Sequence, residues 1–115
     1  MNMGSYGDWY VLTNGAINAL VEDERMGNYL LGIEDSDGKV TVKYIGRSDT
    51  DLASRLKDHV KEYYTYFAFR YAPSKTAAYR QECQDYHYYY NNLDNKIHPD
   101  APSNINRICP VCGRL

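Results

Sequence analysis

The sequence lacks any long apolar segment. No run in its 115 residues approaches the roughly 20 apolar residues that a membrane span requires. No charged-then-apolar leader opens the chain. We therefore expect a soluble, unexported, cytoplasmic protein without membrane contact, and the length suits a single domain with a small core.

Phenylalanine is also scarce, with two residues against thirteen tyrosines. Because tyrosine adds a hydroxyl group to an apolar ring, we expect a core that is hydrogen-bonded at its edges. The chain contains no repeat and no low-complexity segment. Residues 91–106 are polar and rich in Asn, Asp and Pro, which is typical of a loop.

An excess of positive charge is missing, since the formal net charge is −2. The charges are unevenly distributed, however. Residues 1–38 carry seven acids and one arginine, whereas residues 39–80 carry nine Lys or Arg against four acids. A basic middle provides the local positive potential that phosphate contacts need. The acidic run at residues 22–24 indicates a solvated surface.

Two short runs rich in β-branched and aromatic residues, Tyr29–Glu34 and Val40–Ile45, flank the sequence Asp-Ser-Asp-Gly. This composition predicts a β-hairpin. In a bulge-free hairpin with an even loop, Tyr29 and Tyr44 share one face of the sheet, because the side-chain period is two. A four-residue loop, 35–38, places the two tyrosines directly opposite each other.

An amphipathic helix over residues 51–60 follows the hairpin, with Asp49 or Thr50 as its N-cap. Its apolar stripe consists of Leu52, Leu56 and Val60. Arg55 and His59 are four residues apart, so they lie one above the other on a neighbouring face.

The remaining segments complete an α/β fold. Residues 1–26 are predicted to form a helical segment, broken near Asn14, that covers the sheet. Residues 63–71 alternate and are aromatic, which predicts a third strand, and Ser74 caps a helix to about Tyr90. We expect a small three-stranded antiparallel sheet flanked by helices, in the order α-β-β-α-β-α.

Several of these residues carry a family pattern. Gly27-Asn28-Tyr29, then Tyr44-Ile45-Gly46, then a helix with Arg-x-x-x-His and a later glutamate, resembles the GIY-YIG nuclease family. Asn28 stands where isoleucine is usual, and the gap between the tyrosines is longer than in most members. The resemblance covers about residues 27–95 and implies a nuclease core there, with residues 96–115 forming a loop and tail that pack on it.

Glu82 lies three residues after Tyr79 and four before Tyr86 on the last predicted helix. A carboxylate on an apolar helix face is costly unless it is paired or binds a cation. The alternative is a partly exposed acid. The resemblance implies that Glu82 holds the catalytic ion, Mg²⁺ or Mn²⁺, for which one protein carboxylate is enough.

The resemblance also implies roles for the other motif residues. Tyr29 or Tyr44 would activate or position the attacking water, and Arg55 would clamp the phosphate with help from His59. The expected substrate-binding residues are Arg47, Ser48 and an asparagine after the glutamate helix, for which Asn95 and Asn104 compete.

The implied function is a metal-dependent endonuclease acting on duplex or branched DNA. The first alternative is a catalytically silent module of the same fold that binds nucleic acid or protein. A third possibility is an adaptor with a zinc-bound tail.

Cysteine is sparse, with three residues in the chain. Cys109-x-x-Cys112 is half of a zinc site, and Cys83 with His87, four residues apart on one helix face, can supply the other half. His98 is a rival fourth ligand. Without an export signal, a structural zinc ion is favoured over a disulfide. The alternative is a reduced tail without metal.

Overall fold

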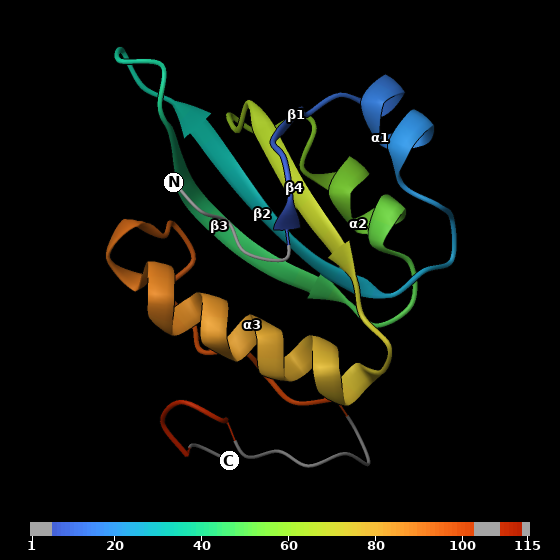
Figure 1. Ribbon diagram of the computed structural model, residues 1–115, viewed down its shortest axis with the longest axis vertical. Helices are drawn as coiled ribbons and strands as arrows, with labels where there is room; N and C mark the ends of the chain where they lie inside the picture. The colour runs from blue at the N-terminus through green and yellow to red at the C-terminus, as the bar shows by residue number, and fades with distance from the viewer. Residues whose placement is uncertain (1–5, 103–108, 114–115) are drawn as a thin grey trace.

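The computed structural model describes residues 6–102 and 109–113. Its elements are, in order, β1 (Tyr10–Val11), α1 (Asn14–Leu20), β2 (Gly27–Glu34), β3 (Val40–Ser48), α2 (Leu52–Asp58), β4 (Tyr66–Tyr71), α3 (Lys75–Tyr89) and a short 3₁₀ turn, η2 (Tyr90–Asn92). The predicted α/β class is confirmed (Figure 1). The sheet is antiparallel with the strand order β1-β4-β2-β3, so the expected number of three strands is wrong.

The extra strand comes from the N-terminal segment. Tyr10 and Val11 pair with β4 at its free edge, opposite Phe67 and Tyr66. The helix that follows is not broken near Asn14, as the sequence suggested, but begins there. The side chain of Thr13 caps it by accepting a hydrogen bond from the backbone N–H of Ala16 at 3.0 Å.

The hairpin of β2 and β3 has a five-residue turn, 35–39, rather than a four-residue one. The Asp35 side chain organises this turn by accepting from the backbone N–H groups of Asp37 and Lys39, at 2.8 Å and 3.0 Å. Gly38 adopts a φ of +82°, which glycine tolerates without steric cost.

An odd loop alone would place Tyr29 and Tyr44 on opposite faces of the sheet. A register shift between Leu31 and Gly32 puts one extra residue into β3 and restores the shared face. Tyr29 pairs with Gly46, and Tyr44 pairs with Leu31. The shared face is therefore confirmed, whereas the directly opposite pairing of the tyrosines is wrong.

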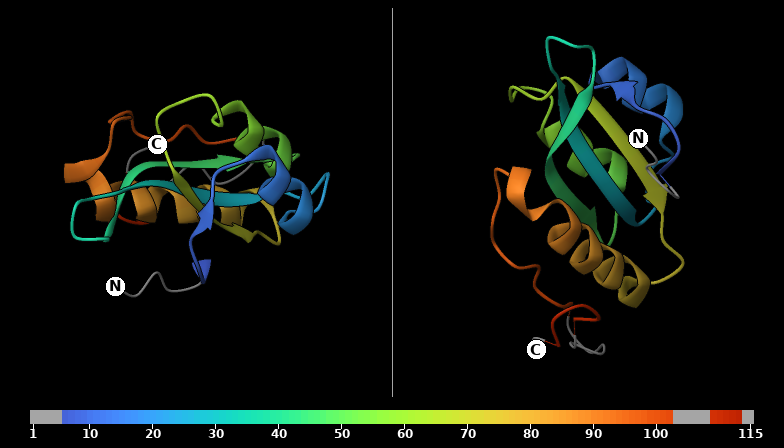
Figure 2. Two further views of the ribbon diagram at one scale, coloured as in Figure 1. Left: turned by 90° about the horizontal axis from the view of Figure 1, so that it is seen from above. Right: turned by 60° about the vertical axis from the view of Figure 1, so that its left-hand side comes forward.

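The helices lie on both faces of the sheet (Figures 1 and 2). Tyr29 and Leu31 of β2 point into a core formed with α1 and α2, while Leu30 points into a second core formed with α3. β3 is an edge strand, with no further strand beside it. Side chains from the two faces of the sheet can therefore meet around its end. None of the helices in the described residues is long and apolar enough to cross a membrane.

The last strand and helix follow the prediction with shorter bounds. The strand runs over Tyr66–Tyr71 instead of 63–71. Tyr63 and Tyr64 lie before the strand, where their hydroxyl groups donate hydrogen bonds to Asp94. Ser74 caps α3 as expected, accepting from the backbone N–H of Ala77 at 3.0 Å.

Candidate active site

The two motif tyrosines form a stack over a glycine. A Cβ atom on residue 46 would lie 2.4 Å from the Cζ atom and the hydroxyl oxygen of Tyr29, closer than any real contact. Only glycine therefore fits opposite Tyr29. The rings of Tyr29 and Tyr44 are stacked, with centroids 6.2 Å apart and planes at 11°. Tyr29 is buried and Tyr44 is half-buried, so Tyr44 forms the outer end of this stack.

His59 joins the stack from the C-terminal end of α2. Its ring centroid lies 4.7 Å from that of Tyr44, and its Nε2 atom lies 2.9 Å from the Tyr29 hydroxyl. Its Nδ1 atom contacts the Glu62 carboxylate, which only accepts hydrogen bonds when ionised. We assign the proton to Nδ1 on this basis, which leaves Nε2 to accept from Tyr29.

The prediction placed His59 within the helix, on the same face as Arg55. Helix α2 ends at Asp58, and His59 is its C-cap with the side chain buried, whereas Arg55 is exposed. The N-cap is Asp51 rather than Asp49 or Thr50, because the Asp51 carboxylate accepts from the backbone N–H of Ser54 at 3.2 Å.

Burial keeps both tyrosines protonated. It is the largest cause that raises the pKa of Tyr29 and of Tyr44 above the ordinary value of 10. Arg55 lowers both pKa values in part and Glu82 raises both, so the two charged groups are close enough to act on the stack. As neutral phenols, the tyrosines can donate a hydrogen bond and accept one, but they are not bases by themselves.

A cleft of about 330 Å³ opens beside the stack at the end of β3. Its lining comes from the end of β3, the turn into α2, helices α2 and α3, and the segment that follows η2. The lining residues are Arg47, Ser48, Asp49, Thr50, Arg55, Glu82 and Asp100. The cleft thus joins Arg55 of α2 to Glu82 of α3, on opposite faces of the sheet.

Arg47 is held by several acceptors at once. Its guanidinium pairs with the carboxylates of Glu82 and Asp49, the latter at 3.1 Å, and donates to the backbone carbonyl of Asp100. It also lies over the ring of Tyr79, 5.4 Å from the centroid. Although burial opposes the effect, the two carboxylates raise the pKa of Arg47. Arg47 is therefore a fixed cation rather than a free one.

Glu82 is largely buried, with its side chain 13% exposed. Burial raises the pKa of its carboxyl group, and the adjacent Arg47 guanidinium opposes that rise. The carboxylate is thus paired, as its position between aromatic residues required.

Arg55 differs from Arg47 because no acceptor among the described residues holds its side chain. It is exposed at the cleft, and its guanidinium has no hydrogen bond or ion pair with the part of the chain that the structure describes. Ser48 is buried, and its hydroxyl accepts from the backbone N–H groups of Thr50 and Asp51, at 3.3 Å and 2.9 Å. Ser48 therefore shapes the turn that carries the cleft into α2.

Asn95 lies on the edge of β3 and not in the cleft. Its amide donates to the carbonyl of Ile45 at 3.2 Å, and its Oδ1 atom is buried without a partner among the described residues. Asn104, the other predicted asparagine, lies outside the described residues. Asn28, which replaces the usual isoleucine, is fully buried and donates to the Ala78 carbonyl of α3 at 2.8 Å.

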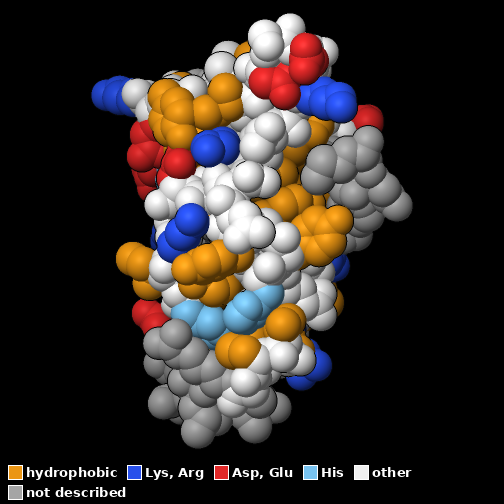
Figure 3. Space-filling model, turned by 90° about the vertical axis from the view of Figure 1, so that its left-hand side faces the viewer, with side chains coloured by type: hydrophobic (Ala, Val, Ile, Leu, Met, Phe, Trp, Pro, Cys, Tyr) orange, Lys and Arg blue, Asp and Glu red, His pale blue; other side chains and the backbone are white. Residues whose placement is uncertain are grey.

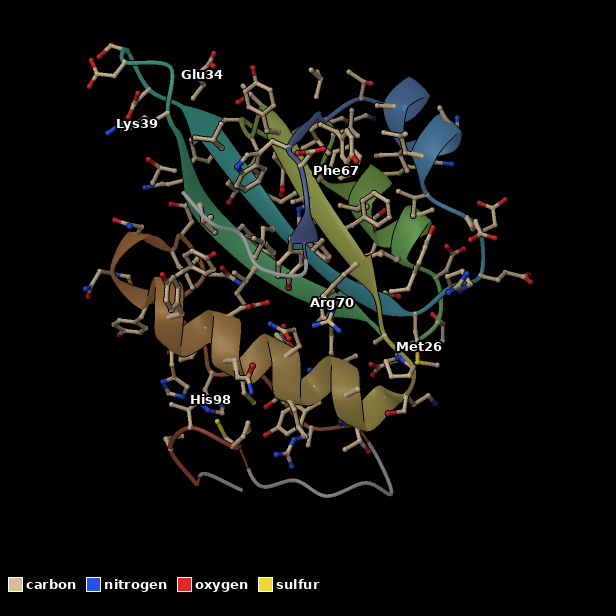
Figure 4. The ribbon with its side chains drawn as sticks, viewed as in Figure 1. Met26, Glu34, Lys39, Phe67, Arg70 and His98 are labelled. Atoms are coloured by element: carbon tan, nitrogen blue, oxygen red, sulfur yellow. The ribbon has the colours of Figure 1, made fainter. Side chains whose placement is uncertain are left out.

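A separate cluster of metal-ligating side chains lies near the C-terminus. The nitrogen and sulfur atoms of His87, His98, Cys109 and Cys112 all lie within 4.8 Å of one another, an arrangement that could hold a metal such as zinc. Figure 3 shows histidine side chains gathered in the lower half of the view, and Figure 4 places His98 between α3 and the C-terminal turn. Although burial opposes it, hydrogen bonds from the backbone of Cys112 and Val111 lower the pKa of Cys109 to about 6.

Cys83, predicted as a ligand, is not a member of this cluster. It is fully buried beside Tyr79 and Cys109, and burial raises its pKa to about 12, so it remains a thiol. His98 takes its place, because the chain after η2 returns alongside α3. The spacing of Cys83 and His87 along one helix could not show that a later segment brings His98 to the cluster.

The sequence interpretation missed three contacts in this region. Glu62 orients His59 and is three residues away from it, a spacing that offered a signal. Asp49 and the Asp100 carbonyl bind Arg47. The contact with the Asp100 carbonyl could not be predicted, because any residue carries a backbone carbonyl and the loop is distant in sequence.

Comparison with protein-family models, with curated proteins and with solved structures gave no match for this chain.

Proposed function

We propose that this protein is a divalent-metal-dependent endonuclease that hydrolyses DNA phosphodiester bonds by a single-metal mechanism of the GIY-YIG type. The observation that carries the proposal is one cleft lined by both Arg55 and Glu82, beside the stack of Tyr29, Tyr44 and His59. Phosphodiester hydrolysis needs charge relief on the phosphate, a stabilised leaving oxygen and a group that takes a proton from water. Side chains suited to each task lie at this site.

The donor atoms at the cleft suit a hard divalent ion. Glu82, Asp49 and Asp100 all line it, and Mg²⁺ prefers oxygen ligands while keeping several of its waters. Glu82 would hold Mg²⁺ or Mn²⁺ there, with room in the open cleft for waters. When bound, the ion would supply charge neutralisation at the leaving oxygen.

Arg55 is the side chain for the substrate phosphate. It is exposed and unpaired within the described residues, so binding a phosphate costs no existing contact. Its planar guanidinium can donate two parallel hydrogen bonds to phosphate oxygens. The basic composition of residues 39–80 favours a polyanion such as DNA as the substrate.

The tyrosine stack supplies a route for the proton. Tyr44, at the outer end, positions the attacking water. The proton of this water passes through the hydrogen-bonded hydroxyls of Tyr44 and Tyr29 to Nε2 of His59. The Glu62 carboxylate stabilises the imidazolium that forms. The water oxygen bonds to phosphorus as the bond to the leaving oxygen breaks.

A binding module without turnover is the second candidate, and one contact favours it. Arg47 already occupies the Glu82 carboxylate, as it would in a site that no longer binds metal. In the enzyme, the same contact has a different consequence. Burial raises the pKa of Glu82, and the Arg47 contact opposes that rise and so favours the ionised carboxylate that a metal needs.

Parallel binding and cleavage assays separate the two candidates. The protein is incubated with supercoiled plasmid and with branched DNA, with Mg²⁺, with Mn²⁺ and with EDTA. The enzyme nicks or cuts DNA with either ion and is inactive in EDTA. DNA binding without cleavage under all three conditions would favour the binding module.

A further inference from the structure

The cluster at the C-terminus joins three parts of the chain. His87 lies in the last turns of α3, His98 lies in the segment after η2, and Cys109 and Cys112 lie in the C-terminal turn. His87 is four residues beyond Cys83, yet it points into this cluster and Cys83 does not. Four nitrogen and sulfur atoms from three separate segments converge on one point.

The distances match a tetrahedral ion. Zinc bonds of about 2.3 Å to sulfur and about 2.05 Å to nitrogen place neighbouring S and N ligands about 3.6 Å apart in a tetrahedron. Cys109 Sγ lies 3.6 Å from His87 Nε2, and Cys112 Sγ lies 3.4 Å from His98 Nε2. Two independent thiol–imidazole hydrogen bonds would not need all four atoms to lie within 4.8 Å of one another.

The surrounding contacts orient the ligand atoms. His98 Nδ1 donates to the Pro99 carbonyl at 3.0 Å, which leaves Nε2 free to bind a metal. The turn that carries the cysteines is closed by a hydrogen bond of 2.9 Å from the Gly113 N–H to the Cys109 carbonyl. Gly113 has a φ of +73°, which favours glycine.

We propose that His87, His98, Cys109 and Cys112 bind one structural zinc ion. Two imidazoles and two thiolates are the ligands that zinc prefers, and four protein ligands leave no open position for chemistry. Mg²⁺ is excluded from this set because it takes oxygen ligands. The zinc ion is therefore distinct from the divalent ion proposed at Glu82.

The zinc ion also restrains the segment that contacts Arg47 at the cleft. His98 lies between two contacts of the same segment, the Asn95 amide on the Ile45 carbonyl and the Asp100 carbonyl on Arg47. The residues from Asp94 to Pro102 form no helix or strand. Zinc bound at His98 restrains this segment, and with it the carbonyl that holds Arg47 against Glu82.

Metal analysis tests the proposal directly. Protein purified without chelator and without a metal-binding tag should contain about one zinc per chain. Cys112→Ser and His98→Ala should lose most of this zinc, and a strong chelator should lower the melting temperature of the wild type. Folded wild-type protein without zinc would overturn the proposal.

Cys83→Ala is the matched control, since Cys83 adjoins the cluster and belongs to the rival ligand set. It should retain zinc. Loss of zinc from Cys83→Ala, with retention in His98→Ala, would overturn the assigned ligands.

Because Cys83 is fully buried, its variant can fail to fold. Cobalt substitution of the wild type then decides the ligand set. Its thiolate-to-cobalt absorption should correspond to two thiolates, and an intensity corresponding to three would contradict it. Neither readout involves DNA, so failure here is separate from failure of the nuclease proposal.

Hydrogen exchange tests the link to the cleft. Removing zinc should increase exchange in residues 96–101 and at the turn after β3, with little change at Val40 and Val42. Unchanged exchange at the turn would show that the zinc ion does not support Arg47.

Discussion

Replacing Gly46 by alanine tests why the motif requires glycine. The added methyl group would lie 2.4 Å from two atoms of Tyr29 and 2.7 Å from a third, against an ordinary contact of at least 3.4 Å. Tyr29 is 1% exposed and packs against Tyr44 and His59, so it has little room to move away. The overlap of about 1 Å must therefore strain the core or displace the ring.

The expected cost follows from two effects and one compensation. Overpacking costs about 1–3 kcal/mol, and breaking the Tyr29–His59 hydrogen bond costs about 1 kcal/mol. Alanine reduces the entropy of the unfolded chain, which returns about 0.5–1 kcal/mol. The net loss is about 1–3 kcal/mol, or roughly 4–12 °C in melting temperature for a domain of this size.

Thermal unfolding followed by far-ultraviolet circular dichroism measures this loss. Gly15→Ala is the control, because nothing lies within 4 Å of a Cβ atom there and the residue is in α1. That variant should be neutral or slightly stabilised. Gly46→Ala should also reduce DNA cleavage, since the proposed proton route runs through Tyr29. A Gly46→Ala protein as stable as the wild type would refute the packing explanation.

Two further predictions concern Asp85 and Arg55. Burial raises the pKa of Asp85 from 3.8 to about 6, so its stabilising contribution is present below about pH 4 and is lost as the pH rises through about 6. Asp85→Asn does not titrate at this position. Relative to the wild type, its free energy of unfolding should therefore rise by about 2 kcal/mol between pH 4 and pH 7.5, and a constant difference in chemical denaturation would contradict this. Arg55→Lys keeps the charge but loses the two-pronged donor set, so kcat for DNA cleavage should fall more than substrate binding. Equal activity of the lysine variant would show that Arg55 belongs only to the basic surface.

The sequence was sufficient for the elements with strong local signals. The hairpin, the Ser74 cap and the long final helix are specified by turn residues, a capping hydroxyl and length, and the structure contains all three. The two-residue strand β1 had no such signal. It exists because the free edge of β4 offers hydrogen-bonding partners to any extended segment that reaches it.

The register of the hairpin shows a compensation that sequence alone did not reveal. The interpretation assumed an even loop without a bulge, and the structure has an odd loop with one register shift. Both arrangements put Tyr29 and Tyr44 on one face. Burial of one face therefore determines that the two tyrosines share it. More than one combination of loop length and bulge satisfies that requirement.

Long-range contacts account for the rest. Helical periodicity placed His59 within the helix on one face with Arg55, but hydrogen bonds to Tyr29 and Glu62 hold its buried side chain at the C-cap of α2. Likewise, spacing grouped Cys83 with His87, whereas the return of the loop brought His98 to the cluster. Which of several eligible ligands meet depends on the path of a segment without regular structure.

The central claim is that Glu82 supports metal-dependent cleavage of DNA. Its most direct test is the rate of plasmid nicking as a function of Mg²⁺ concentration, for the wild type and Glu82→Gln purified in parallel. Glu34→Gln is the control, since Glu34 is exposed at the hairpin end of β2 (Figure 4) and does not line the cleft. We predict saturable nicking by the wild type and the control, and a loss of at least about a hundredfold in Glu82→Gln, with an unchanged circular dichroism spectrum. Equal nicking rates in Glu82→Gln and the wild type would contradict the account.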